Sequence, residues 1–126
     1  MGTSASTIPI NRIFRAFSDA TRLRILSLLK QGEHCVGDLV TILGLPQPKV
    51  SRHLAYLRKA GLVEARGQGL WNFYRLAPAG SPFHKKLLEC LSACFGDVPK
   101  VARDAEKAKA LRIDGGCCPD SDSCKR

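Results

Sequence analysis

The sequence predicts a mainly helical protein that carries one small β-hairpin. Along most of the 126 residues, apolar side chains recur three or four positions apart, which is the spacing of a helix face. Between Leu62 and Leu76 this spacing stops, and two short apolar runs flank the turn sequence GQG, as in a hairpin. The chain is long enough for one domain with its own core and too short for two of ordinary size.

The first half of the chain is expected to form four helices. The first is expected near residues 8–17, and Ser18 or Asp19 is a suitable N-cap for a second, TRLRILSLLKQ. A third helix is expected over 37–43. A turn with the sequence GLPQ then leads into a fourth, PQPKVSRHLAYLRKA, which ends at Gly61. Two helices joined by a short turn that contains glycine are the sequence form of a helix-turn-helix.

The second half of the chain is expected to form the hairpin and two further helices. The hairpin is followed by a helix over 82–95 and by a last one capped by Asp97, with Pro99 in its first turn. The order helix, helix, helix-turn-helix, hairpin, helix predicts a winged helix-turn-helix domain over residues 8–112. Residues 113–126 have almost no apolar side chains to bury and are expected to form a flexible, cysteine-containing tail.

The charge of the chain favours a polyanionic partner. Lys and Arg number 20 against 11 Asp and Glu, which gives a net charge of +9. The fourth predicted helix buries Val50, Leu54 and Leu57, so its other face is free to contact double-stranded DNA in the major groove. With the tip of the hairpin, it supplies the candidate DNA-binding residues Gln47, Lys49, Ser51, Arg52, His53, Tyr56, Arg66 and Gln68.

Three segments resemble the ArsR/SmtB family of metal-sensing transcriptional repressors: FSDATRLRILSLL, GLPQPKVSRHLAYLRKAGLV and the hairpin ending in YRL. The resemblance covers about residues 10–95. It implies a winged-helix homodimer in which the first helix and the helix at 82–95 form the interface. It also implies binding to a roughly palindromic operator, with release when a toxic metal or metalloid binds.

The two ligand sites that the family resemblance implies are both incomplete in this sequence. The stretch EHCVGDL is similar to ELCVCDL of arsenite and cadmium/lead sensors, but Gly37 stands where the second cysteine is expected, beside Cys35. The other family site uses Asp, His and Glu on the interface helix. His84 is the only histidine between residues 82 and 112.

The cysteines suggest a different ligand site. Cys117, Cys118 and Cys124 lie in the expected tail, where no core explains them, and soft thiolates select soft ions. Their spacing resembles that of arsenic-responsive family members, so the expected inducer is trivalent arsenic (arsenite or methylarsenite) or antimonite, with no organic cofactor. Cys90 and Cys94 share a helix face and can chelate or simply pack in a core, and Cys35 is a further possible contributor.

Three other functions stay open at this stage. The thiols can serve a redox- or persulfide-sensing repressor, or a cadmium or lead sensor, on the same fold. A metallochaperone without DNA binding is a more remote alternative. An enzyme is not expected, because none of the three histidines lies in a motif that pairs a nucleophile with a base. No apolar run is long enough for a membrane span and no signal peptide is recognisable, so a cytoplasmic protein without a membrane partner is expected.

Overall fold

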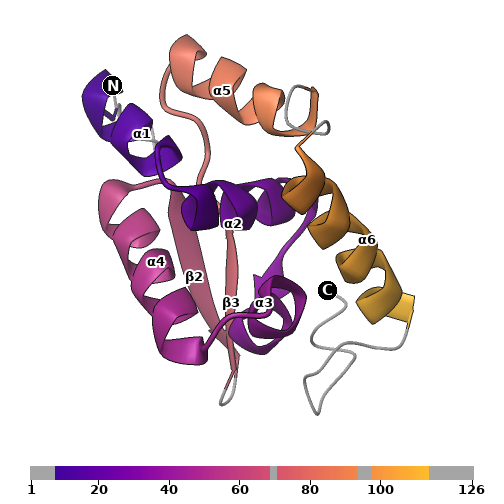
Figure 1. Cartoon of the computed structure of the whole chain (residues 1–126). Coiled ribbons are helices and arrows are strands. Elements are labelled where there is room, and N and C mark those ends of the chain that lie inside the picture. Colours follow the sequence, from indigo (N-terminus) through magenta and orange to yellow (C-terminus); the bar gives the residue numbers. More distant parts are fainter. Residues whose placement is uncertain (1–7, 69–70, 94–97, 114–126) are drawn as a thin grey trace.

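The computed structural model describes residues 8–68, 71–93 and 98–113, and it confirms the mainly helical fold with a winged helix-turn-helix (Figure 1). The sequence-predicted helices are all present, and within the described residues their bounds lie one or two residues from those expected. The expected end of the helix over 82–95 and the expected cap Asp97 lie outside the described residues. The elements are α1 (Ile10–Phe17), α2 (Ala20–Gln31), β1 (His34–Cys35), α3 (Val36–Leu43), α4 (Gln47–Ala60), β2 (Val63–Gln68), β3 (Trp71–Leu76), α5 (Pro82–Ala93) and α6 (Pro99–Ile113).

Helix α2 lies at the centre of the molecule and contacts α1, α4, α5, α6 and β3. Five consecutive residues of this helix, from Ile25 to Leu29, are buried, because neighbours cover it on several sides rather than along one stripe. The core extends from α2 into α3 and α4, through Leu39, Ile42, Leu54 and other apolar side chains. The central position of α2 means that the elements around it are all positioned against one helix.

The sheet has three antiparallel strands in the order β1-β3-β2, one more than the predicted hairpin. Strand β1 is two residues long and pairs with β3, so that Cys35 lies opposite Phe73. Two residues are too few to show the alternation by which strands are recognised in a sequence, which is why this strand was not expected. In the hairpin itself, β2 and β3 pair from Val63–Leu76 to Gln68–Trp71.

Local sequence signals fix the ends of the helices around the helix-turn-helix. The side chain of Asp19 caps α2 by accepting a hydrogen bond from the backbone N–H of Arg22 at 3.0 Å, which selects Asp19 over Ser18 as the N-cap. Helices α3 and α4 both end at a glycine in the left-handed region, Gly44 with φ 67° and Gly61 with φ 90°. Gly44 therefore sets where the turn between α3 and α4 begins, and Gly61 sets where α4 ends.

Helix α6 packs against both α2 and α3 (Figure 1). Val101, Asp104 and Ala108 form its buried side, at the spacing of a helix face. Among the described helices, none combines the length and the apolar character that crossing a bilayer requires.

Candidate nucleic-acid interface

Helix α4 divides its side chains between the core and the surface as the sequence predicts. Val50, Leu54 and Leu57 are fully buried. Gln47 and Arg52 are exposed, whereas Lys49 and Ser51 are half-buried, all in the first two turns of the helix. These turns are the part of a recognition helix that reaches base edges in the major groove.

His53 faces helix α2. Its Nδ1 lies 3.8 Å from Oδ2 of Asp19, the carboxylate that also caps α2. Burial lowers the pKa of His53, and the attraction of Asp19 only partly opposes this because Arg22, Lys49 and Arg52 also favour the neutral ring. Burial raises the pKa of Asp19, but the N–H of Arg22 and the charges of His53 and Arg22 outweigh it, so the net pKa is lowered.

The guanidinium of Arg22 stacks on the ring of Tyr56. The Cζ of Arg22 lies 4.0 Å from the ring centroid, which is a cation–π contact. The same guanidinium donates to the backbone carbonyls of Ala16 and Arg15 at 3.1 Å and 3.0 Å, at the C-terminal end of α1. Arg22 and Asp19 thus orient side chains of the recognition helix, a role that the sequence did not reveal because it depends on how α1, α2 and α4 meet.

The charged side chains of the wing are paired along its length. The guanidinium of Arg66 donates to both carboxylate oxygens of Glu33, at 2.6 Å and 3.2 Å, and lies 5.1 Å from the ring centroid of Phe73. The hydrogen bond to Glu33 raises the pKa of Arg66. Arg75 pairs with Glu64 across the hairpin at 3.1 Å. Gln68 ends β2, and its side chain lies outside what the structure describes.

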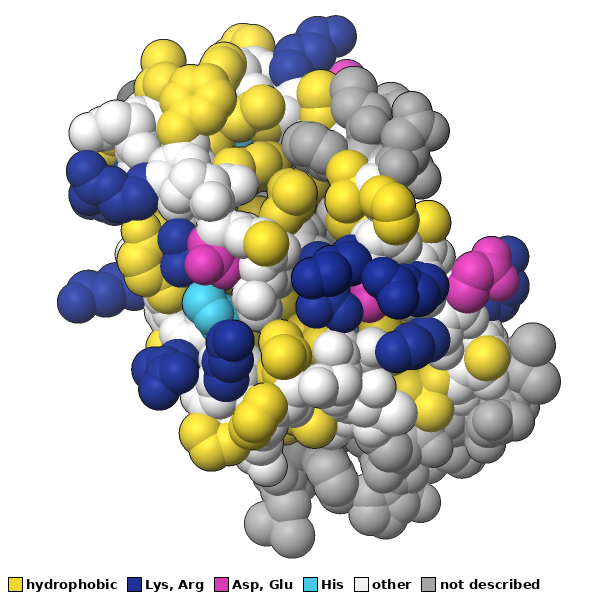
Figure 2. All heavy atoms as spheres, in the orientation of Figure 1, with side chains coloured by type: hydrophobic (Ala, Val, Ile, Leu, Met, Phe, Trp, Pro, Cys, Tyr) yellow, Lys and Arg dark blue, Asp and Glu magenta, His cyan; other side chains and the backbone are white. Residues whose placement is uncertain are grey.

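One face of the molecule combines separate groups of positive side chains with an apolar end (Figure 2). Lys and Arg side chains gather over α4 and α6, whereas hydrophobic side chains gather over α1 and α5. On α1, Ile10 and Phe14 are 56% and 53% exposed, which is unusual for large apolar side chains. The ring of Phe14 meets that of Phe83 on α5 edge-on, with centroids 5.4 Å apart, so the two helices share this apolar surface.

Two of the six cysteines, Cys35 and Cys90, lie within the described residues. Cys35 is fully buried in β1, where it immediately precedes α3, and Cys90 is half-buried in α5. The other four, Cys94, Cys117, Cys118 and Cys124, lie outside the described residues. Within the described ranges, no three His, Cys, Asp or Glu side chains come together as metal ligands would.

His84 is fully buried near the start of α5. Its Nδ1 accepts a hydrogen bond from the backbone N–H of Gly80 at 3.2 Å, and its Nε2 has no hydrogen-bond partner among the described residues. This pattern assigns the single proton of the neutral ring to Nε2. Burial lowers the pKa of His84, which keeps the ring neutral.

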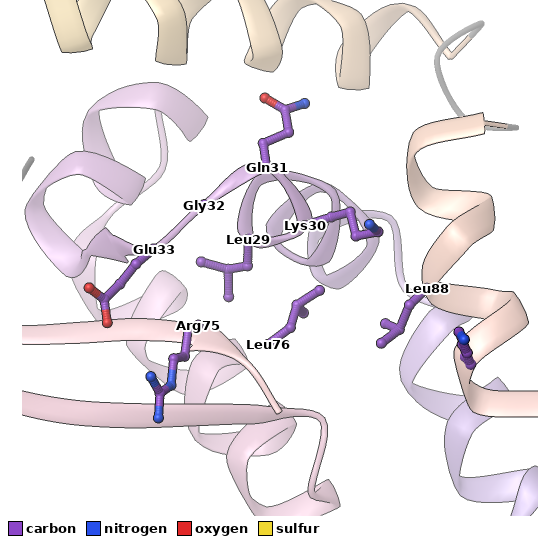
Figure 3. A pocket seen from close by; sticks show the side chains of 9 residues that line it. Leu29, Lys30, Gln31, Gly32, Glu33, Arg75, Leu76 and Leu88 are labelled. Atoms are coloured by element: carbon purple, nitrogen blue, oxygen red, sulfur yellow. The ribbon is translucent and has the colours of Figure 1, made fainter. Parts of the chain in front are cut away.

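A shallow hollow of about 610 Å³ lies between the end of α2, strand β3 and α5 (Figure 3). Leu29, Leu76 and Leu88 line it together with the cations Lys30 and Arg75. Lys85 of α5 also contributes to its lining. No residue of α4 lines the hollow, and we assign it no part in DNA binding.

Comparisons with known proteins agree with this arrangement. Residues 19–65, from the cap of α2 to β2, match the family model described as bacterial regulatory protein, arsR family. The chain is 47% identical over 83 residues to the arsenical resistance operon repressor of Escherichia coli K12, which covers 65% of this chain and 70% of that protein.

Two solved structures extend the comparison to the fold. HlyU from Vibrio cholerae superposes with a TM-score of 0.61 and 35% identity, over 68% of this chain and 89% of that one. The solution structure of the homodimeric winged helix-turn-helix DNA-binding domain of Mb0332 from Mycobacterium bovis gives a TM-score of 0.56 and 25% identity, over 86% and 85% of the two chains. The chain therefore belongs to the ArsR family of bacterial regulatory proteins and is a DNA-binding transcriptional repressor with a winged helix-turn-helix.

Proposed function

We propose that this chain is a homodimeric repressor that leaves its operator when a trivalent arsenical or antimonial binds the thiolates of Cys117, Cys118 and Cys124. The observation that carries the proposal is the concentration of three of the six cysteines within the last ten residues, beyond the proposed domain of residues 8–112. Thiolates are the ligands that soft ions prefer. The E. coli relative, named for arsenical resistance, supports the same class of inducer.

Operator binding is proposed to use the exposed face of α4 and the wing. Gln47 and Arg52 are exposed in the first turns of α4, and they suit bidentate contacts to adenine and guanine respectively. Lys49, Ser51, His53 and Tyr56 flank them. Arg66 and Gln68 lie near the end of β2, where a wing meets the DNA backbone or the minor groove. The net charge of +9 supplies the sequence-independent attraction to phosphate.

Dimerisation is proposed to bury the apolar surface shared by α1 and α5. Ile10 and Phe14 are more than half exposed in the single chain, and Phe14 already contacts Phe83 of α5. A two-fold interface covers the same patch on both copies, so it removes both sets of exposed side chains from water at once. Two recognition helices related in this way read half-sites one turn of DNA apart, about 34–36 Å.

Two of the remaining thiols are weaker candidates for the inducer site. Cys35 is fully buried between the sheet and α3, so an ion can reach its Sγ only if the core opens. Cys90 is half-buried on α5, within the helix assigned to the dimer interface. In contrast, Cys117, Cys118 and Cys124 lie within eight residues of one another in the sequence, and three thiolates suit the trigonal geometry that trivalent arsenic takes.

Release requires that the ion bind one form of the repressor better than the other. A ligand with equal affinity for the operator-bound and free forms shifts nothing. We propose that closure of residues 113–126 around the ion stabilises the form that fits the operator poorly. A coupling free energy of about 1–3 kcal/mol is typical of such effectors and is enough for a clear change in occupancy.

The test is operator binding by fluorescence anisotropy under reducing conditions, titrated separately with arsenite, methylarsenite, antimonite, cadmium, zinc and peroxide. The proposal predicts release by the trivalent arsenicals or antimonite, and no release by zinc. Release by peroxide alone would replace it with a redox switch at the same thiols. Release by cadmium alone would make the chain a divalent-ion sensor.

A further inference from the structure

The side chain of Arg24 on α2 bridges two other elements of the structure. Its guanidinium donates to both carboxylate oxygens of Asp104 on α6, from Nε at 2.7 Å and from Nη2 at 2.9 Å. The same Nη2 also donates to the backbone carbonyl of Leu43 at 3.3 Å. One planar group therefore joins the middle of α6 to the last residue of α3.

The bridge is shielded from water. The side chain of Asp104 is 3% exposed and that of Arg24 is 15% exposed. A buried carboxylate without a cation is costly, so loss of the pair would destabilise α6 in this position. The planar guanidinium has donors in fixed directions, and lysine cannot reproduce them with a single ammonium.

The carbonyl that Arg24 holds lies at the start of the turn of the helix-turn-helix. Leu43 is the last residue of α3, and Gly44 follows it in the left-handed conformation, with its N–H donating to the carbonyl of Val40 at 2.9 Å. Helix α4 begins three residues later, at Gln47. A shift of the Leu43 carbonyl therefore acts directly on the segment that sets the position of the recognition helix.

We propose that Arg24 and Asp104 are positioning residues through which α6 controls the recognition helix. While α6 is docked, Asp104 orients the guanidinium and the guanidinium holds the turn. When α6 moves, the turn loses this support and the fit to the operator declines. Residues 114–126 follow α6 in the sequence, so the bridge also gives the inducer a physical route to the DNA-binding surface. This last part rests on the proposed function, whereas the positioning role does not.

Three full-length variants test the positioning role without any inducer. Asp104→Asn removes the charge, and Arg24→Lys keeps a charge but cannot span the carboxylate and the Leu43 carbonyl together. Glu106→Gln is the matched control, because it removes one exposed carboxylate from the same helix. Affinity is measured by anisotropy on an operator duplex selected from random DNA by the wild-type chain, and on a non-specific duplex of equal length.

Asp104→Asn and Arg24→Lys are expected to lose about tenfold in specific affinity, in the range of typical coupling between sites. Their non-specific affinity and the slope of log affinity against log salt should stay at the wild-type values, because both side chains are largely buried and paired with each other. Hydrogen exchange of the Gly44 amide, which needs no DNA, should be faster in both variants. Glu106→Gln should match the wild type in every measurement.

Specific affinity and Gly44 exchange equal to those of Glu106→Gln would overturn the proposal. A loss that is the same on specific and non-specific DNA and that follows a smaller folded fraction would also overturn it, because it would show only general destabilisation. Failure of arsenite to release the wild-type chain would instead count against the proposed inducer, and it would leave the result for Arg24 and Asp104 standing.

Discussion

At the scale of single residues, the surface of the recognition helix depends on side chains from its neighbours. Asp19 caps α2 and faces His53, and Arg22 stacks on Tyr56 while it binds the end of α1. His53 and Tyr56 are therefore oriented by α2, whereas Arg52 extends to solvent. This difference separates residues that shape the DNA-binding surface from those best placed to contact base edges.

Replacing Arg52 with alanine should weaken operator binding by about 1–3 kcal/mol, the range for loss of a bidentate contact to a base. Non-specific binding should change much less, because it depends on the total positive charge. Arg58→Ala is the matched control, since Arg58 is an exposed arginine near the other end of the same helix. Equal losses for the two variants in an anisotropy titration would contradict the assignment of Arg52.

His84 should make the folded state sensitive to acid. Burial holds its folded-state pKa below the value of about 6.5 that it has in the unfolded chain. Between these two pKa values the unfolded chain binds more protons, so the free energy of unfolding should fall as the pH decreases below about 6.5. Protonation would also turn Nδ1 into a donor that faces the N–H of Gly80.

The variant His84→Asn keeps an acceptor for the Gly80 N–H and does not titrate in this range. Urea unfolding of both proteins at pH 7.5 and pH 5.5 should show a smaller decrease in stability for the variant. An equal decrease in the two proteins would assign the acid sensitivity to other groups, of which the half-buried His53 is the first to examine.

At the scale of elements, the ends of α3 and α4 are fixed by two glycines that differ in their surroundings. A Cβ added to Gly44 would meet no atom within 4 Å, whereas one added to Gly61 would lie 3.3 Å from Cδ1 of Ile8. Both substitutions place alanine in the left-handed region, which costs about 1–2 kcal/mol. The environment then adds a second cost at Gly61 alone.

Gly61→Ala should therefore lower the free energy of unfolding more than Gly44→Ala, because Ile8 must also shift. The two variants are compared by urea denaturation against the wild type, with the slope of the transition checked for constancy. A larger loss for Gly44→Ala would show that the turn of the helix-turn-helix tolerates less change than its open surroundings indicate.

The sequence predicted those elements that have strong local signals. The helices follow from apolar spacing together with caps such as Asp19 and Gly61, and the hairpin follows from GQG. Strand β1 was missed because two residues carry no pattern, and its pairing with β3 comes from the tertiary fold. The buried face of α4 was also predicted, since Val50, Leu54 and Leu57 occupy it, together with Ala60 at the end of the helix.

The contacts that join distant segments could not be predicted. Arg24 and Asp104 are 80 residues apart, and Arg66 and Glu33 are 33 apart, so no local pattern connects them. In the sequence, Arg24, Asp104 and Glu33 were ordinary charged residues, and Arg66 was expected to contact DNA rather than a carboxylate. Their pairing depends on how α6 packs against α2 and on how the wing lies beside the end of α2. The helical period of the sequence was enough to predict which residues lie on the outer face of α4. The orientation of their side chains depends on contacts with other elements and could not be predicted.

At the scale of the whole molecule, the two ends of the domain are suited to different partners. The apolar surface of α1 and α5 lies at one end, and positive side chains over α4 and α6 lie away from it (Figure 2). Such a separation lets two copies associate without covering the surface proposed to bind DNA. The proposed dimer would also cover large apolar side chains such as Ile10, which is 56% exposed in the single chain.

Phe14→Glu should weaken self-association by about 2 kcal/mol or more, because it places a charge at the centre of the proposed interface. Sedimentation equilibrium should show more monomer, and operator affinity should fall with it because a monomer reads one half-site. Asn11→Glu adds the same charge at an exposed polar position of α1 and should leave the dimer intact. A Phe14→Glu protein that remains as dimeric as the control would refute this interface.

The proposed inducer site is tested most directly by the effect of arsenite on a variant in which Cys117, Cys118 and Cys124 are all changed to serine. If these thiolates bind the inducer, this variant should bind the operator as tightly as the wild type and stay bound at arsenite concentrations that release the wild type. Cys90→Ser, which removes a thiol outside the proposed site, should be released normally. Release of the triple variant at the wild-type arsenite concentration would contradict the central claim and move the inducer site to the other thiols.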